Sequence, residues 1–355
     1  MNHHLISFLV IFYNQQDYVE NALNHILNIQ IPKGFEREIL IGDDGSTDNT
    51  QKIIQNYLKK YKEMQLFIMP RNKTTDPSKR SGENRLNLLK HAKGIYFCIS
   101  DGDDYYSNNQ WILKAISILN NDLNLSIAAF QHEIINENNE KNPSTTLNLK
   151  NGKHNIVEYI QTQTYTHAAA CLFRTPNLKQ LDFLIQMNSF VDTHIVLSFL
   201  TFGDIYITQE IVYSYKANGG IWLSYNEAEQ HLRIALSFCF LSYYFPQYQK
   251  EFKKTHFHSL VFLFENRQHF WELLKIKEEK SIYYKEQFKQ PINLLLNQIL
   301  NFDSLNSKDK KIIQNFFKGL LFLKIKKKIK NSIDLKNYYL NGVKYKIKKI
   351  IHNKF

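Results

Sequence analysis

Short apolar runs alternate with amphipathic stretches through the first third of the chain, and this alternation restricts the fold more than any other feature. The apolar runs lie at 5–12, 38–42, 65–69 and 95–100, with helical patterns between them. Strands that alternate with helices form parallel sheets with right-handed crossover connections. We therefore predict an α/β fold in which helices flank a mostly parallel sheet.

Polar residues follow three of these predicted strands at the point where each strand ends. Tyr13 follows the first, Asp43 and Asp44 follow the second, and Asp101-Gly102-Asp103-Asp104 follows the fourth. In sheets of this kind, ligands bind beyond the carboxyl ends of the strands. The three segments are therefore expected to meet at one crevice.

The segment 101–104 places three carboxylates within four residues, a charge density that needs neutralisation. Such carboxylates are tolerated together when a divalent cation or hydrogen bonds offset their repulsion. Hard oxygen ligands suit Mg²⁺ or Mn²⁺, which protein carboxylates share with substrate phosphates. The segment predicts a metal site for a phosphorylated substrate. An acidic turn that caps the next helix is the alternative interpretation.

In chain order, the segments YN, EILIGDDGSTDNT, DGDD, VD and GGIW resemble family 2 of the glycosyltransferases, the inverting enzymes with the GT-A fold. The resemblance covers residues 4–222 and implies a Rossmann-like, mixed and mostly parallel sheet flanked by helices. It also implies that one sugar is moved from a nucleotide donor, a UDP-sugar in the first place.

The resemblance assigns donor-binding roles to the strand ends. Tyr13 matches the aromatic residue that stacks on uracil, and Asp44, with Asp43 beside it, matches the acid that hydrogen-bonds the base N3–H. The basic residues of 70–85 flank the crevice expected to hold phosphate. Of these, Arg85 is assigned to the donor, whereas Arg71, Lys79 and Arg80 are interpreted as residues of a solvated loop.

The same resemblance assigns the metal to the acidic segment. Asp101 matches the acid near the ribose and the metal, and Asp103, one residue past Gly102, matches the ligand of the cation that bridges the diphosphate. The implied cofactor is Mn²⁺ or Mg²⁺.

Four residues are assigned to catalysis or to the acceptor. Asp192 matches the general base, although Val191 stands where the family usually has the Glu of a Glu-Asp pair. Asp104 is expected to support the acceptor pocket, His194 is a further candidate there, and Trp222 matches an aromatic residue of the loop that closes over the acceptor. An ordinary helix N-cap is the alternative for Asp192.

Two other functions compete with this interpretation. A nucleotidyltransferase would also have a metal site at the edge of the sheet, but it needs a basic phosphate-binding loop after the first strand. Residues 13–17 contain no basic residue, which argues against this function. An inactive glycan- or nucleic-acid-binding protein is the other, and Asp44, Asp101 and Asp103 argue against it.

The 355 residues are expected to form a GT-A domain at 1–225 and a helical region at 226–355. No apolar run approaches the ~20 residues of a membrane span, and Cys98, Cys171 and Cys239 are interpreted as buried thiols of a cytosolic protein. The net charge of +12 is concentrated in 318–355, which has twelve Lys, no Arg and one acid, Asp334.

Ile and Leu recur on one helical face of this basic tail, as in helices that lie on anionic membranes. A helix packed on the body with its Lys face in solvent is the alternative. We expect a peripheral protein at the inner face of a bacterial cytoplasmic membrane that does not bind nucleic acid. Its expected acceptor is a glycan or lipid-linked glycan of lipooligosaccharide, capsule or a related surface polymer. The sequence leaves open whether the helical region forms a homodimer.

Overall fold

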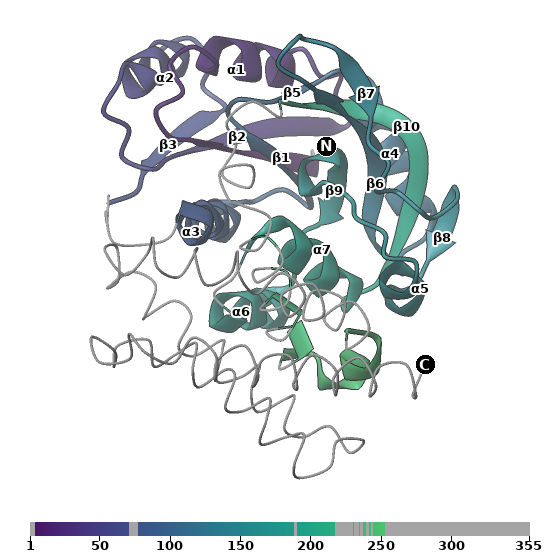
Figure 1. Cartoon of the computed structure of the whole chain (residues 1–355). Helices are drawn as coiled ribbons and strands as arrows, with labels where there is room; N and C mark the ends of the chain where they lie inside the picture. Colours follow the sequence, from purple (N-terminus) through teal and green to yellow (C-terminus); the bar gives the residue numbers. More distant parts are fainter. Residues whose placement is uncertain are drawn as a thin grey trace, which may run out of the picture. The chain divides into compact units, whose positions relative to one another are not determined.

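The computed structural model in Figure 1 describes residues 4–70, 77–187 and 190–216, together with part of 230–252. The strands are β1 (His4–Phe12), β2 (Phe35–Asp43), β3 (Met64–Ile68), β4 (Tyr96–Asp101), β5 (Tyr105–Tyr106), β6 (Leu125–Ile135), β7 (Lys141–Pro143), β8 (Gly152–His154), β9 (Cys171–Arg174) and β10 (Asp204–Lys216). The α-helices are α1 (Val19–Leu27), α2 (Thr50–Leu58), α3 (Pro77–His91), α4 (Trp111–Asn121), α5 (Ile156–Gln161), α6 (Leu178–Met187) and α7 (Asp192–Leu200). Two short 3₁₀ turns are η1 (Ala168–Ala170) and η2 (Pro246–Tyr248).

These strands form one mixed sheet in the order β3-β2-β1-β4-β9-β6-β10-β5. The first four strands in this order are parallel to one another, and so are β6 and β10. Between these two parallel groups, β9 runs antiparallel to both β4 and β6. The predicted α/β architecture, with a mostly parallel sheet flanked by helices, is confirmed.

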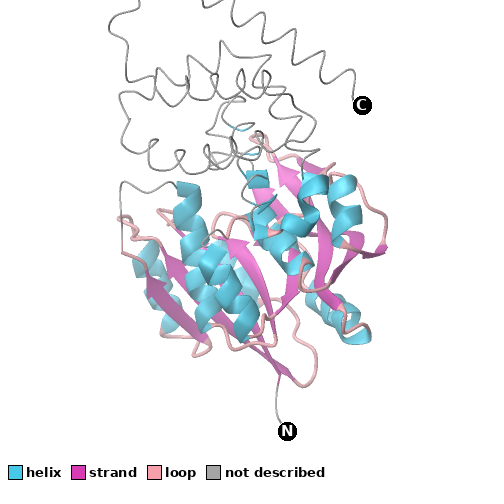
Figure 2. Cartoon of the chain, turned by 90° about the horizontal axis from the view of Figure 1, so that it is seen from below, coloured by secondary structure: helices cyan, strands magenta, loops and turns pink. Residues whose placement is uncertain are grey.

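Helices cover both faces of the sheet, as Figures 1 and 2 show. One face carries α1, α2 and α4, whose apolar residues pack with Phe8, Val10 and Phe12 of β1. On the opposite side, α7 packs through Phe199, whose ring lies 5.4 Å from that of Phe97 in β4. Successive residues of β1 therefore enter two different apolar layers, as the two-residue period of a strand requires.

Strand register brings the sequence motifs to one level of the sheet. Phe12, the last residue of β1, pairs with Asp43 of β2, and Ile11 pairs with Asp101 of β4. Because β1 is the central strand of the three, the residues that follow Phe12, Asp43 and Asp101 all emerge at the same edge. The predicted convergence of the motifs is thus a consequence of hydrogen-bond register.

The structure corrects several element boundaries. Asp17 and Glu20 have the spacing of a capping box, but α1 begins at Val19, and no side chain caps its first turn. The carbonyl of Gln15 accepts the amides of Tyr18 and Val19 instead. The apolar segments 204–208 and 211–215 have the pattern of two short strands but form the single irregular strand β10. The polar segment 136–152 has the pattern of a loop but contains β7 and the start of β8.

The start of α3 is the largest of these corrections. The polar, basic segment 70–82 has the pattern of a loop, but α3 begins at Pro77, a residue well suited to a first helical turn. Gly82 therefore lies inside a helix. A Cβ added there would approach the backbone nitrogen of Phe190 to 3.2 Å, so this glycine permits close packing of the segment that precedes α7.

The chain separates into two compact units, Met1–Ser224 and Tyr225–Phe355. Trp222, Cys239 and the basic tail lie outside the described residues. Cys98 and Cys171 are buried free thiols. Within the described part of the chain, no helix combines the length and hydrophobicity needed to cross a membrane.

The aromatic contact beneath α7 provides a test of this packing. We expect Phe199→Ala to lower the free energy of unfolding by about 3–5 kcal/mol, because it removes a fully buried ring between Phe97 and Phe173. Leu123→Ala, at a side chain that is 80% exposed, is the matched control and should change stability little. Urea unfolding followed by circular dichroism measures both, and equal losses would contradict the proposed core.

Candidate active site

The loops that follow β1 and β2 are fastened to each other by a row of hydrogen bonds. The amide of Asn14 donates to Oγ of Ser46 at 2.9 Å, and its side-chain oxygen accepts the amide of Thr47 at 2.8 Å. The amide of Gln15 donates to Oγ1 of Thr50 at 2.9 Å. Much of the segment DDGSTDNT therefore supports the loop that carries Tyr13. Tyr13 itself lies at the tip of β1, 40% exposed.

The two adjacent acids of this segment have different surroundings. Asp43 is completely buried and accepts hydrogen bonds from the amide of Ser46 at 2.8 Å and from the side chain of Gln51 at 2.6 Å. Gly45, with φ +71, provides the left-handed residue that this tight turn requires. The position of Asp43 thus favours a role in holding the turn, and its contact with a nucleotide stays a prediction.

Asp44 faces a basic residue that sequence reasoning assigned to solvent. Nε of Arg80 donates to Oδ2 of Asp44 at 2.9 Å, and Nη2 bonds the other oxygen, so the pair is bidentate. Arg80 is only 6% exposed, and its hydrogen bond with Asp44 raises the pKa of the guanidinium. The interpretation of Arg80 as a loop residue is wrong because α3 begins early enough to carry it. Lys79, one residue earlier, is exposed, and Arg71 lies outside the described residues.

Gly102 is required by close packing at the end of β4. A Cβ at this position would overlap the ring of Phe12 and the side-chain oxygen of Gln15. The glycine therefore lets the acidic turn lie directly against the end of β1. Gly102 therefore has a steric role at this turn, and its predicted contact with the donor is untested.

A buried arginine joins the acidic turn to the start of α7. Nη2 of Arg85 lies 2.6 and 2.8 Å from the two carboxylate oxygens of Asp101, and Nη1 lies 2.9 Å from Oδ1 of Asp192. Burial alone would lower the pKa of Arg85, but the two carboxylates together raise it by more, so the guanidinium stays charged. The expected contact of Arg85 with a donor phosphate stays a prediction, because its side chain is 7% exposed and points into this ion bridge.

The surroundings of Asp103 disfavour its ionised form. Burial, followed by the charge of Asp101, raises the pKa of Asp103 to about 6, despite a hydrogen bond with Gln15 and the nearby charge of Lys216. A divalent cation would relieve the repulsion between the carboxylates of Asp101 and Asp103. The pair Asp101 and Asp103 therefore fits the predicted metal ligands, and its occupancy by a metal is untested.

Asp104 points inward. It is 1% exposed and accepts hydrogen bonds from the amide of Lys216 at 2.8 Å and from the hydroxyl of Tyr213 at 3.1 Å. Burial and the neighbouring acids raise its pKa. Asp104 thus ties the acidic turn to β10, and its predicted role in the acceptor pocket is untested.

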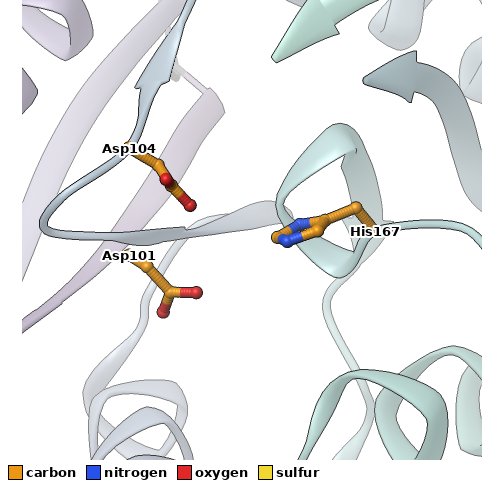
Figure 3. A group of neighbouring side chains, drawn as sticks. All are labelled: Asp101, Asp104 and His167. Atoms are coloured by element: carbon orange, nitrogen blue, oxygen red, sulfur yellow. The ribbon is translucent and has the colours of Figure 1, made fainter. Parts of the chain in front are cut away.

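Sequence reasoning did not find His167, which completes a group of three possible metal ligands. Ligand atoms of Asp101, Asp104 and His167 lie within 4.8 Å of one another, and in Figure 3 the imidazole ring is directed toward the carboxylates. Nδ1 of His167 accepts the amide of Ala169 at 3.3 Å.

Asp192 is the first residue of α7, and its carboxylate is 25% exposed. Burial would raise its pKa, but Arg85, then His167, and the hydroxyl of Tyr165 at 3.3 Å lower it, so the group stays ionised. Asp192 and the acidic turn lie at one site, joined by Arg85. His194 is buried within the same helix, and its acceptor role stays a prediction. Trp222 is outside the described residues.

Tyr165 and His167 gave no signal in the sequence, because they lie in an irregular segment between α5 and β9. Their place beside Asp192 follows from the antiparallel strand β9, which returns the chain next to β4. Arg80 was visible as a basic residue, but its pairing depended on where α3 begins.

The sequence of this chain is similar to those of known glycosyltransferases. The family model for Glycosyl transferase family 2 matches residues 7–181. An uncharacterized glycosyltransferase of Haemophilus influenzae is 26% identical over 62% of this chain and 87% of its own length. The poly(ribitol-phosphate) beta-glucosyltransferase of Bacillus spizizenii is 34% identical over 28% of this chain and 15% of its own length.

The fold is also found among solved structures. S. aureus TarS 1–349, crystallised in complex with UDP-GlcNAc, superposes with a TM-score of 0.57 at 17% identity, covering 89% of this chain and 88% of that structure. Fold, site and family match define a GT-A glycosyltransferase. Residues 7–181, about half of the chain, carry a glycosyltransferase family 2 domain.

The negative charge of Asp103 is expected to lower the free energy of unfolding, and this effect can be tested. Because its folded pKa of about 6 lies above the ordinary value of 3.8, ionised Asp103 destabilises the folded state. This destabilisation begins as the pH rises through the unfolded value and is complete above about pH 6. In chelator, Asp103→Asn should therefore raise the free energy of unfolding by about 1–3 kcal/mol at neutral pH and leave it nearly unchanged near pH 4.

Urea unfolding at the two pH values measures this effect. Asp182→Asn, at an exposed position of α6, is the control and should change stability little at either pH. A loss of stability in Asp103→Asn at neutral pH would show that the carboxylate has a neutralising partner.

Proposed function

We propose that this glycosyltransferase transfers a sugar from a UDP-sugar to a hydroxyl group of a glycan or lipid-linked acceptor, with inversion at the anomeric carbon and with Mn²⁺ or Mg²⁺ as cofactor. The observation that carries the proposal is the arrangement of Asp101, Asp103 and Asp192 at one edge of the sheet. We assign Asp101 and Asp103 to the diphosphate and its cation, and Asp192 to the proton transfer.

Recognition of the base is assigned to the tip of β1 and the turn after β2. Tyr13 presents an exposed ring suited to stacking on a planar base. Beside it in the hydrogen-bonded loops, the pair Asp44–Arg80 offers both acceptors and donors, which suits the imide edge of uracil. The UDP-GlcNAc held by S. aureus TarS, whose fold this chain shares, favours the same donor class.

Asp101 and Asp103 would hold the cation. When bound, the cation neutralises the charge that develops on the departing diphosphate. The fit rests on the burial of Asp103 and on its repulsion by Asp101, which together raise the pKa of Asp103. Arg85 neutralises Asp101, whereas no cationic side chain is hydrogen-bonded to Asp103 among the described contacts.

Asp192 is proposed to accept the proton of the acceptor hydroxyl. The hydroxyl oxygen forms a bond to the anomeric carbon while the bond from that carbon to the diphosphate oxygen breaks. The proton passes to Asp192, and UDP leaves with the electron pair of the broken bond. A carboxylate whose pKa is lowered by Arg85 is ionised at neutral pH and available for this role.

The acceptor is proposed to lie at an anionic membrane surface on the cytoplasmic side. The support for this part is the Lys-rich segment 318–355, whose charge pattern suits such a surface. A surface glycan of a bacterium, such as lipooligosaccharide or capsule, is the product class that this location favours.

Donor binding is the first test of the proposal. We expect UDP with Mn²⁺ to raise the melting temperature by several degrees, because a ligand that binds only the folded state stabilises it by mass action. The shift should vanish with chelator and in Asp103→Ala, and it should persist in Asp182→Asn. Other nucleoside diphosphates serve as the comparison. Absence of a shift with every nucleotide, from folded protein, would contradict the proposed function.

Turnover provides the second test. Asp192→Asn should lower kcat for UDP release from a UDP-sugar by about 100-fold or more, because it removes the proton acceptor. Its affinity for UDP with Mn²⁺ should stay within about threefold of the native value, since Asp192 does not contact the donor in this mechanism. A Tyr165→Phe variant, which removes only the 3.3 Å hydrogen bond to Asp192, should lose much less activity. Full turnover in Asp192→Asn would show that Asp192 is not the proton acceptor.

A further inference from the structure

Arg85 connects two carboxylates that come from different parts of the fold. Asp101 ends β4, Asp192 begins α7, and Arg85 projects from α3 between them. Its Nη2 bonds both oxygens of Asp101 at 2.6 and 2.8 Å, and its Nη1 bonds Asp192 at 2.9 Å. The guanidinium is 7% exposed, whereas the two carboxylates are 24% and 25% exposed. The cation thus lies behind the acids, and the acids line the accessible side.

The guanidinium is well suited to fix the angle between these acids. It is planar, always charged, and presents its donors in a rigid fork. Nε of Arg85 is buried without a hydrogen-bond partner in the described part of the chain, so the orientation of the group is determined by its two terminal nitrogens. Both of these donate to the acids.

Asp192 has few other partners that hold its carboxylate. The hydroxyl of Tyr165 reaches Oδ2 at 3.3 Å, a longer contact than that with Arg85. The other titratable groups that interact with Asp192 are the imidazoles of His167 and His132, the thiol of Cys171 and the hydroxyl of Tyr215. Neither imidazole has a hydrogen bond to Asp192 among the described contacts. Arg85 is therefore the main determinant of where Asp192 points.

We propose that Arg85 is a positioning residue for the transfer reaction, which fixes the Asp192 carboxylate relative to Asp101 and thereby aligns the proton acceptor with the donor side of the site. This inference rests on the proposed function. Arg85 acts through Asp192 and makes no contact with the donor phosphates. It differs in this respect from Arg80, which belongs to the base-binding pair with Asp44.

A double-mutant cycle tests whether Arg85 acts through Asp192. We expect Arg85→Gln to lower kcat for UDP release about 100-fold in the native background and by less than about threefold in the Asp192→Asn background. The KM for the donor should change by less than about threefold in both. Equal losses of kcat in the two backgrounds, or a rise in KM of tenfold or more, would overturn the proposal in favour of direct phosphate binding.

The pH profile of kcat provides an independent readout. Loss of the cation beside Asp192 should move the acidic limb of the profile to higher pH in Arg85→Gln, because Arg85 lowers the pKa of that carboxyl. Arg85→Lys keeps the charge but loses the fork, so it should keep most of the native limb position while kcat falls about tenfold. An unchanged limb in Arg85→Gln would overturn the proposal, because a merely structural role leaves the limb in place.

Arg37→Gln, at a half-buried arginine outside the site, is the control for the loss of an arginine and its hydrogen bonds. Arg37 donates to the carbonyls of Ile26, Leu27 and Ile29, away from the acidic segment, so this variant should lose stability while kcat and its pH limb stay native. Circular dichroism establishes folding of each variant, and Arg85→Lys carries the test if Arg85→Gln does not fold. Failure of the native protein to bind UDP with Mn²⁺ would contradict the proposed function. Native binding and turnover with an additive cycle would contradict only the role of Arg85.

Discussion

Negative charge gathered at the carboxyl edge of the sheet is the constraint around which this site is arranged. Six carboxylates lie there, belonging to Asp43, Asp44, Asp101, Asp103, Asp104 and Asp192. Arg80 neutralises one of them, Arg85 neutralises two, and neutral donors satisfy Asp43 and Asp104. Burial and the neighbouring acids raise the pKa of both Asp103 and Asp104. A divalent cation beside Asp101 and Asp103 would relieve part of this repulsion.

Helix α3 makes this balance of charge possible. It begins at Pro77 and packs against β1 and β2, so it carries both arginines to the ends of the strands. Arg80 reaches the turn after β2, and Arg85, five residues later, reaches the end of β4 and the start of α7. A single helix thus serves the base-binding part of the site and the proton-transfer part. Gly82, between the two arginines, lets the segment before α7 approach closely enough to be reached.

The short-range hydrogen bonds of the two loops explain why the segment DDGSTDNT carries so many polar residues. Ser46, Thr47 and Thr50 bond the loop after β1, and Asp43 and Gly45 shape the turn. Only Asp44 of this segment is paired with an arginine. Most residues of the segment therefore hold Tyr13 and Asp44 in place.

The sequence by itself determined the α/β class, the order of the strands along the chain, and the convergence of Tyr13, Asp44 and Asp101 at one edge. These follow from local hydrophobic pattern and from the geometry of parallel strands, which place successive strand ends together. Tertiary structure alone decided the partners of the acids. Arg80, Tyr165 and His167 come from segments with weak local patterns, and their contacts depend on the start of α3 and on the antiparallel return of β9. Side chains far apart in sequence meet through packing, and packing leaves no periodic signal in the residues that take part in it.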